Sequence, residues 1–173
     1  MYSYTWDEET GGLLLNSSPL PFSKEPRPVY SQELDILGFN KYWKYDKSDT
    51  IPLMWAEANN YIYRGRVVAQ TKGGSFFTAP KIIIIDDPEP GNNDLQFVDI
   101  DRMLSKNQTL LEQLSADTIK KVYNTYKNFK KKIDIFHVSF SGGKDSEVAL
   151  DIVQRALPHN EFVVILGKIQ KTF

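Results

Sequence analysis

The feature that most constrains the fold is a glycine-rich turn between a buried strand and an amphipathic helix. Residues 133–140 have the apolar pattern of a buried strand, and residues 147–157 place apolar side chains at helical spacing before Pro158. Between them lies Ser-Gly-Gly-Lys-Asp-Ser at 141–146. A helix N-terminus presents unpaired N–H groups and the positive end of its dipole. The sequence therefore predicts an anion site at this turn.

The residue types of the turn suit the binding of phosphate. Gly142 and Gly143 lack the Cβ atoms that would keep a phosphate from the backbone, and the two serines add hydroxyl donors. Lys144 adds a mobile positive charge. Asp145 suits either of two roles: it holds a divalent cation such as Mg²⁺ that bridges phosphate oxygens, or it orients the lysine.

Two common phosphate-binding motifs do not fit. The P-loop of NTPases has a glycine five residues before its Gly-Lys pair and Ser or Thr after it, where this chain has Val138 and Asp145. The dinucleotide-binding fingerprint needs a third spaced glycine and a later acidic strand end, which are both lacking.

The motif in its strand-to-helix context resembles the pyrophosphate loop (PP-loop) of the adenine nucleotide α-hydrolase-like superfamily. Over residues 134–165 the chain is most similar to the phosphoadenosine phosphosulfate (PAPS) reductase family. The resemblance implies binding of ATP or PAPS, and sulfate reduction or adenylation with sulfur transfer in a full-length relative. It assigns no catalytic residue and no metal ligand. The nucleotide-contacting positions that it implies are Ser141, Gly142, Gly143, Lys144, Asp145 and Ser146.

The chain also departs from this family. The reductases carry a reactive Cys in a C-terminal segment, whereas this sequence contains no cysteine. Only the last 27 of the 173 residues follow Ser146, and each βαβ unit of a doubly wound sheet takes about thirty. Relatives have Gly-Asp-Thr after the second strand, but Lys-Ile-Gln-Lys-Thr-Phe follows Gly167 here. We therefore expect a truncated or frameshifted N-terminal portion, with weak or no catalysis; a shifted frame of GAT-ACA-AAA, which encodes Asp-Thr-Lys, encodes Ile-Gln-Lys.

The sequence pattern predicts an α/β protein in three parts. Residues 1–93 predict a small, mainly β module that ends in a linker rich in proline and asparagine at 86–93. Residues 94–133 predict a helical connector, as one helix or as two broken near Ser115. Residues 134–173 predict the first β-loop-α-β of a Rossmann-like PP-loop domain, left incomplete.

Within the first part, residues 2–6 and 13–15 predict a hairpin, and residues 17–28 predict an irregular segment because they are rich in proline and serine. Ser31 has the chemistry to cap a short helix that Gly38 would end.

A second function class is kept open: a nucleic-acid- or protein-binding N-terminal module with a vestigial nucleotide loop. Residues 59–66 mix aromatic side chains with arginines and could stack bases while gripping phosphates. In one extended strand, however, Tyr61 and Tyr63 would face away from Arg64 and Arg66, which favours an ordinary half-buried strand.

Two further groups of residues have competing interpretations. Lys127, Lys130, Lys131 and Lys132 crowd the end of the predicted helix. They are either a solvated last turn that complements the helix dipole or an electrostatic funnel for a polyanion. His137, on the predicted strand, is either a structural residue or a group that touches a nucleotide or acts as a base.

The amino-acid composition excludes several classes of function. The 21 Lys+Arg and 22 Asp+Glu residues give a net charge of −1, which argues against a mainly electrostatic nucleic-acid binder. The lack of cysteine excludes disulfides, thiolate zinc sites and iron–sulfur clusters. No apolar run reaches membrane-spanning length and the N-terminus lacks signal-peptide character, so we expect a cytoplasmic protein without a membrane partner.

Overall fold

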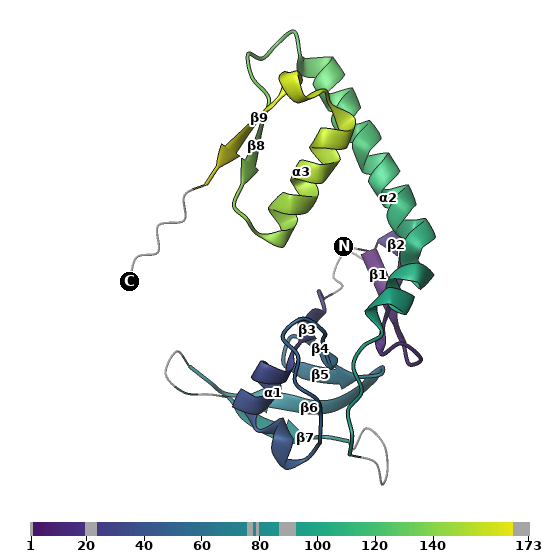
Figure 1. Cartoon of the computed structure of the whole chain (residues 1–173), viewed down its shortest axis with the longest axis vertical. Helices are drawn as coiled ribbons and strands as arrows, with labels where there is room; N and C mark the ends of the chain where they lie inside the picture. Colours follow the sequence, from purple (N-terminus) through teal and green to yellow (C-terminus); the bar gives the residue numbers. More distant parts are fainter. Residues whose placement is uncertain (1, 20–23, 76–77, 79, 87–92, 168–173) are drawn as a thin grey trace. The chain divides into compact units, whose positions relative to one another are not determined.

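The computed structural model describes residues 2–19, 24–75, 78, 80–86 and 93–167 (Figure 1). It is a mixed α/β protein, as expected, and it divides into two compact units, Met1–Leu110 and Leu111–Phe173. The division falls inside helix α2 (Ile100–Phe129), whereas the sequence placed boundaries near residues 93 and 133. Most of the predicted linker at 86–93 lies outside the described residues.

The first unit begins with the predicted hairpin, in which β1 (Tyr2–Asp7) pairs antiparallel with β2 (Gly12–Pro19). The turn is closed by the buried Thr10, whose hydroxyl donates to Asp7 Oδ2 at 2.7 Å and accepts from the Gly12 N–H at 3.2 Å. The irregular segment predicted at 17–28 is wrong at both ends. Residues 17–19 continue β2, and Pro28 lies in β3 (Arg27–Val29), an edge strand, where a missing N–H is tolerated.

A five-stranded antiparallel sheet forms most of the first unit. Its strands are β3, β4 (Met54–Glu57), β5 (Asn60–Tyr63), β6 (Arg66–Lys72) and β7 (Lys81–Ile84), hydrogen-bonded in chain order. The turn between β5 and β6 has positive φ at both central residues, Arg64 (46°) and Gly65 (86°). Positive φ at both positions is typical of two-residue hairpins, so the chain reverses here instead of continuing as one strand.

A short helix, α1 (Ser31–Leu37), and a 3-10 turn (Phe39–Lys41) pack with this sheet. Gly38 ends α1 in the left-handed conformation, as predicted, with φ 79°. The predicted capping role of Ser31 is wrong. Its hydroxyl donates to the Ser48 carbonyl at 3.0 Å and accepts from the Ser48 N–H at 3.1 Å, so it fastens a loop and not the helix.

The core of the first unit is built around Phe39, which is fully buried. Its ring centroid lies 5.2 Å from that of Trp43 and 5.3 Å from that of Tyr61, both of which are also buried. The Tyr61 hydroxyl donates to Glu33 Oε1 at 2.6 Å. Burial of the Glu33 carboxyl raises its pKa, but the hydrogen bonds from Arg27 and Tyr61 outweigh burial and leave that pKa below its usual value.

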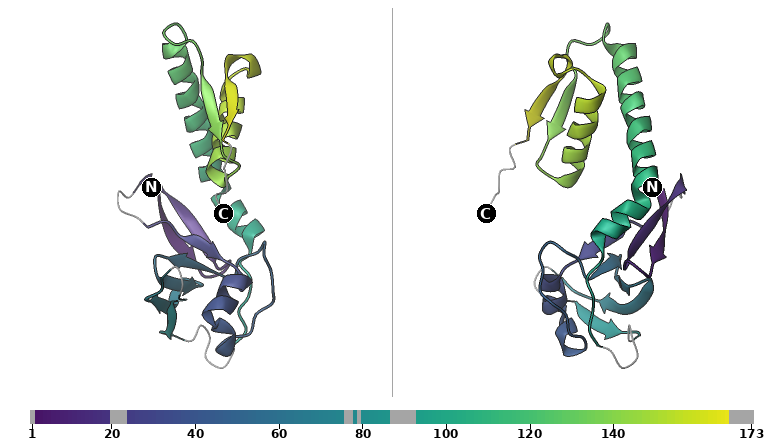
Figure 2. Two further views of the ribbon diagram at one scale, coloured as in Figure 1. Left: turned by 90° about the vertical axis from the view of Figure 1, so that its left-hand side faces the viewer. Right: turned by 45° about the vertical axis from the view of Figure 1, so that its right-hand side comes forward.

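Helix α2 runs without interruption from Ile100 to Phe129, so the alternative of two helices broken near Ser115 is wrong (Figure 2). Its start is capped by Asp99, whose Oδ1 accepts the Arg102 N–H at 3.1 Å. Two turns into the helix, the buried Asn107 accepts the Leu15 N–H and donates to the Leu13 carbonyl, at 2.7 and 2.8 Å. Because the first turns of α2 are bonded to β2, they belong to the first unit.

The second unit contains the expected β-loop-α-β arrangement. Strand β8 (His137–Phe140) leads to α3 (Lys144–Ala156), and after a 3-10 turn (His159–Glu161) β9 (Val163–Leu166) pairs parallel with β8. The core of this unit joins α2, α3 and one face of β8. Its buried members are Tyr126, Leu157 and Phe162, with partly buried neighbours that include Val122, Phe136 and Val138.

Candidate functional site

Residues 141–143 join the carboxyl end of β8 to α3, and residues 144–146 form the first turn of α3, which begins three residues before the predicted start at Glu147. These six residues are called the 141–146 loop. Gly142 has φ +77°, a left-handed conformation that side chains other than glycine rarely adopt. A Cβ at Gly142 would meet no atom within 4 Å, so glycine is favoured there by backbone conformation and not by crowding. Gly143 is the residue before α3 and has an ordinary extended backbone.

The two serines of the loop bind each other and the backbone. Ser146 Oγ donates to the Gly143 carbonyl at 2.7 Å and accepts the Ser141 N–H at 3.3 Å. The Ser141 hydroxyl donates to Ser146 Oγ, also at 3.3 Å. These bonds close the loop on itself, so the hydroxyl groups expected to face a ligand are also the groups that hold the loop in shape.

The loop leaves backbone donors at the start of α3. The Gly143 carbonyl already accepts the N–H groups of Ser146 and Glu147, at 3.0 and 3.1 Å. The N–H groups of Gly142, Gly143 and Asp145 have no acceptor within the part of the chain that the structure describes. These donors at a helix N-terminus are suited to an anion.

Lys144 and Asp145 form a solvent-exposed ion pair, with Lys144 Nζ 2.8 Å from Asp145 Oδ1. Of the two roles considered for Asp145, the contact with lysine is therefore present in the structure. An exposed pair of this kind adds little stability, so both groups are available to rearrange around a ligand. Across the described residues, no group of three or more His, Asp or Glu side chains is placed to hold a metal ion.

The structure does not bring the histidines to the loop. His137 is exposed and begins β8, three residues and thus about 10 Å before the strand reaches the loop. His159 lies in the 3-10 turn after α3, with its ring centroid 6.3 Å from that of Phe162.

The aromatic and basic residues at 59–66 do not form a binding surface of the expected kind. Tyr61 and Tyr63 are both buried, which leaves neither ring free to stack on a base. Arg64 lies in the hairpin turn and donates to the carbonyls of Glu8 and Glu9, at 2.8 and 3.2 Å. The alternation argued for one long strand does not apply because residues 64 and 65 form the turn.

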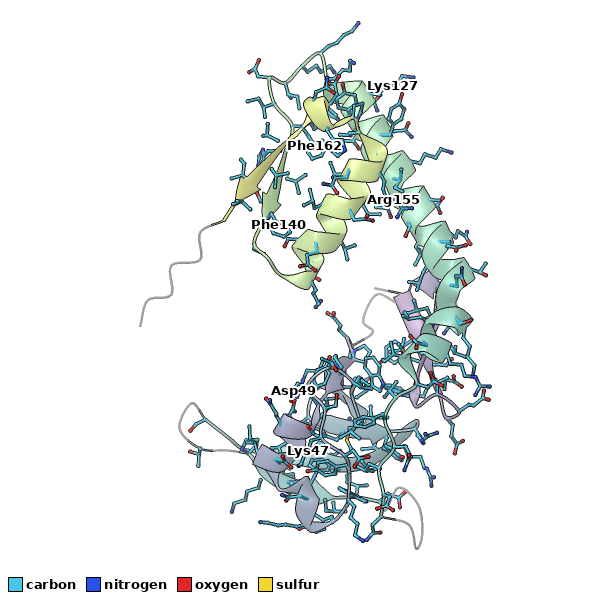
Figure 3. All side chains as sticks on the ribbon, viewed as in Figure 1. Lys47, Asp49, Lys127, Phe140, Arg155 and Phe162 are labelled. Atoms are coloured by element: carbon cyan, nitrogen blue, oxygen red, sulfur yellow. The ribbon has the colours of Figure 1, made fainter. Side chains whose placement is uncertain are left out.

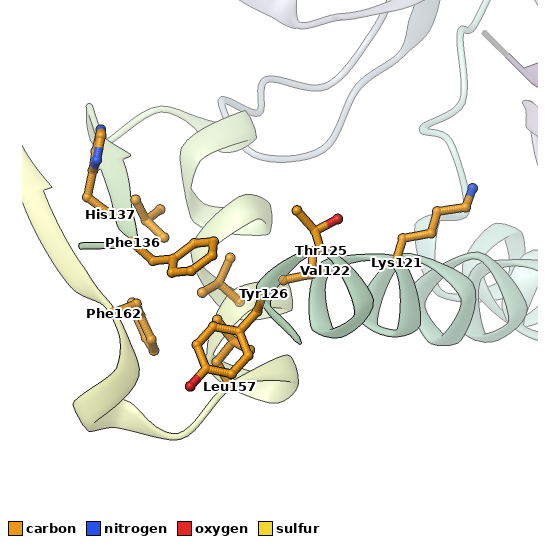
Figure 4. Close-up of a pocket in the computed structure, with 10 residues that line it drawn as sticks. Lys121, Val122, Thr125, Tyr126, Phe136, His137, Leu157 and Phe162 are labelled. Carbon is orange, nitrogen blue, oxygen red and sulfur yellow. The ribbon is translucent and has the colours of Figure 1, made fainter. Parts of the chain in front are cut away.

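A cavity in the second unit was not identified from the sequence. It has a volume of about 240 Å³ and lies between α2, α3 and the start of β8 (Figure 4). Its apolar lining includes Val122, Tyr126, Phe136, Val153, Leu157 and Phe162. The loop follows the opposite end of β8, so the cavity is a separate feature. The signal for it in the sequence is the four-residue spacing of Val122 and Tyr126 and of Val153 and Leu157, which equally predicts a filled core.

Comparison of the chain with protein-family models, with curated proteins and with solved structures found no match in any of the three. In the part of the chain that the structure describes, no helix has both the length and the apolar character needed to cross a membrane.

Proposed function

We propose that residues 141–146 bind the phosphates of an adenine nucleotide, ATP or PAPS, as the loop of a Rossmann-like PP-loop domain. The observation that carries the proposal is the left-handed Gly142 just before α3, together with the N–H groups of Gly142, Gly143 and Asp145, which have no acceptor among the described residues. Together with the parallel pairing of β8 and β9 on either side of α3, it supports the sequence resemblance to the PAPS reductase family.

Each loop residue has a role in this proposal. The backbone N–H groups of Gly142, Gly143 and Asp145 donate to phosphate oxygens, and Lys144 turns from Asp145 to the added negative charge. Asp145 is then released to supply one carboxylate ligand to Mg²⁺, an ion that otherwise takes its ligands from phosphates and water. In the alternative role, Lys144 keeps its contact with Asp145, which orients it. Ser141 and Ser146 keep the loop closed.

The chemistry that follows binding, in this family's terms, is reduction of an activated sulfate or adenylation with loss of pyrophosphate. The loop supplies phosphate binding, and the sequence contains no cysteine for a thiol step. We therefore expect binding without appreciable turnover. Release of pyrophosphate from ATP, or of sulfite from PAPS, at ordinary enzymatic rates would contradict this expectation.

Replacement of Lys144 by alanine is expected to weaken nucleotide affinity by roughly 10- to 100-fold, because a hydrogen bond from a charged donor is lost. Calorimetric titration of the purified chain with ATP and with PAPS measures the change. Lys81→Ala, which removes one exposed lysine in the first unit, is the matched control and should bind as the parent does. If neither nucleotide binds the parent chain, or if both variants bind equally well, the proposal is wrong.

Gly142 offers a test of the backbone conformation alone. Gly142→Ala should weaken ATP affinity by roughly fivefold or more, since forcing an alanine into the left-handed region costs about 1 kcal/mol or more. Gly142→Asn should retain more affinity, because asparagine adopts this conformation more readily. A Cβ at Gly142 would meet no atom within 4 Å, so steric exclusion does not complicate the comparison. Equal affinities for the two variants would show that the left-handed turn is not needed for binding.

A further inference from the structure

The exposed side of the second half of α2 carries an unusual concentration of positive charge. Residues 118–133 contain six lysines and no Asp or Glu, although the whole chain has a net charge of −1. Lys120 and Lys127 are exposed, as is Lys131 just beyond the helix end, and Tyr123 lies among them with 47% of its surface exposed. We call Lys120, Tyr123, Lys127 and Lys131 the lysine face.

Helical spacing places these residues on one side. Positions 120, 123, 127 and 131 recur at intervals of three and four residues, which aligns them along the helix surface. The opposite side of the same segment carries Val122 and Tyr126, which pack in the core of the second unit. Figure 3 marks Lys127 near the end of α2. The lysine face is therefore directed away from the core of its own unit.

Compensation of the helix dipole does not account for this face. The dipole acts within about the last turn of a helix, but Lys120 lies nine residues before Phe129, where α2 ends. Lys130 and Lys132 do have local partners: Lys130 Nζ lies 3.3 Å from the Tyr126 hydroxyl, and Lys132 Nζ lies 5.8 Å from the centroid of the Phe129 ring. Among the described residues, no carboxylate forms an ion pair with Lys120, Lys127 or Lys131.

We propose that the lysine face binds the phosphate backbone of single-stranded nucleic acid, with Tyr123 as a stacking platform for a base. Lys127 lies seven positions after Lys120, a rise of about 10 Å along the helix, so the two lysines can contact different phosphates of one strand. Basic residues that follow the backbone and an aromatic ring that stacks on a base are the usual elements of single-strand binding. A membrane surface fits less well, because the apolar side of this helix is already buried in the core.

The proposal is independent of the nucleotide loop, and its test uses the whole chain. Fluorescence anisotropy of a labelled thymidine homopolymer of about 16 nucleotides gives the affinity, measured between about 50 and 200 mM salt. The test variant is the triple substitution Lys120→Gln, Lys127→Gln and Lys131→Gln, which keeps good helix formers on the surface of the helix. The control, Lys24→Gln with Lys72→Gln and Lys81→Gln, removes the same charge from exposed positions in the first unit.

We expect the test variant to lower the slope of log affinity against log salt by about 2, since each lost phosphate contact accounts for about 0.7. At about 0.1 M salt, this change in slope corresponds to an affinity for the oligonucleotide roughly 100-fold lower than that of the parent chain. The control variant should change the affinity severalfold at most. Tyr123→Leu should weaken binding by at least about fivefold and leave the salt slope unchanged.

Several outcomes would overturn the proposal. They are no binding by the parent chain at about 50 mM salt, an equal loss in the test and control variants, an unchanged affinity in Tyr123→Leu, and tighter binding to a duplex of the same length. Vesicles that contain phosphatidylserine provide the competing case. If the parent chain sediments with these vesicles but does not bind the oligonucleotide, and the test variant no longer sediments, the lysine face would be assigned to a membrane instead.

Discussion

Replacement of Phe39 by alanine is expected to unfold the first unit and to leave the second unit folded. Phe39 is fully buried and packs against the rings of Trp43 and Tyr61. Truncation of a phenylalanine in such a position costs about 3–5 kcal/mol, which is a large share of the 5–15 kcal/mol that holds a typical domain together. No residue of the second core, formed by Tyr126, Leu157 and Phe162, belongs to the first.

Hydrogen-exchange mass spectrometry resolves the two units. Peptides from β4, β5 and β6 should lose protection in Phe39→Ala, while peptides from β8 and α3 keep theirs. Phe39→Leu retains most of the side-chain volume and should cost only about 1 kcal/mol. Loss of protection along the entire chain would mean that the two units unfold as one cooperative body.

The reciprocal change is Phe162→Ala, which removes one of the three buried side chains at the centre of the second core. We expect a loss of about 3–4 kcal/mol. This core is small and borders the cavity beside α2, so few other contacts can compensate. The second unit should unfold while the five-stranded sheet of the first stays protected.

Phe162→Ala also tests whether both proposed binding sites lie in the second unit. Both the 141–146 loop and the lysine face lie in the second unit, so Phe162→Ala should abolish binding of ATP and of the oligonucleotide together. Near-ultraviolet circular dichroism should still report the buried Trp43 and Trp55. If either ligand still binds while β8 and α3 are unprotected, its site does not lie where we propose.

The strand, loop and helix around the candidate site could be predicted from the sequence because each signal there is local. The apolar run, the two glycines and the helical spacing all occur within about 25 consecutive residues. Strand β8, the loop and α3 form at these same residues. The left-handed conformation of Gly142 and the hydrogen bonds of Ser146 depend on coordinates that residue types alone do not specify. The residue types point to phosphate binding, and binding itself stays a prediction.

The errors arose where distant residues compete with local chemistry. Ser31 has the side chain of a helix cap, but the loop at Ser48 takes its hydroxyl. The sequence predicts that Arg64 lies in a strand, but Arg64 lies in a hairpin turn and donates to the carbonyls of Glu8 and Glu9. The lysine face illustrates a different limit, since net charge averages over the chain and conceals a local concentration of one sign.

The bonds from Asn107 to β2 have a consequence for synthesis of the chain. Strands β3 to β7 pair in chain order and can form as they emerge, since short loops close at little entropic cost. The hairpin of β1 and β2 is made first, but its contacts with Asn107 span 92 and 94 residues. At about 5–20 residues per second, a ribosome needs about 5–20 s to supply that helix. During that interval the hairpin lacks its bonds to Asn107 and is held to the rest of the first unit by earlier partners such as Arg64, which donates to the carbonyls of Glu8 and Glu9.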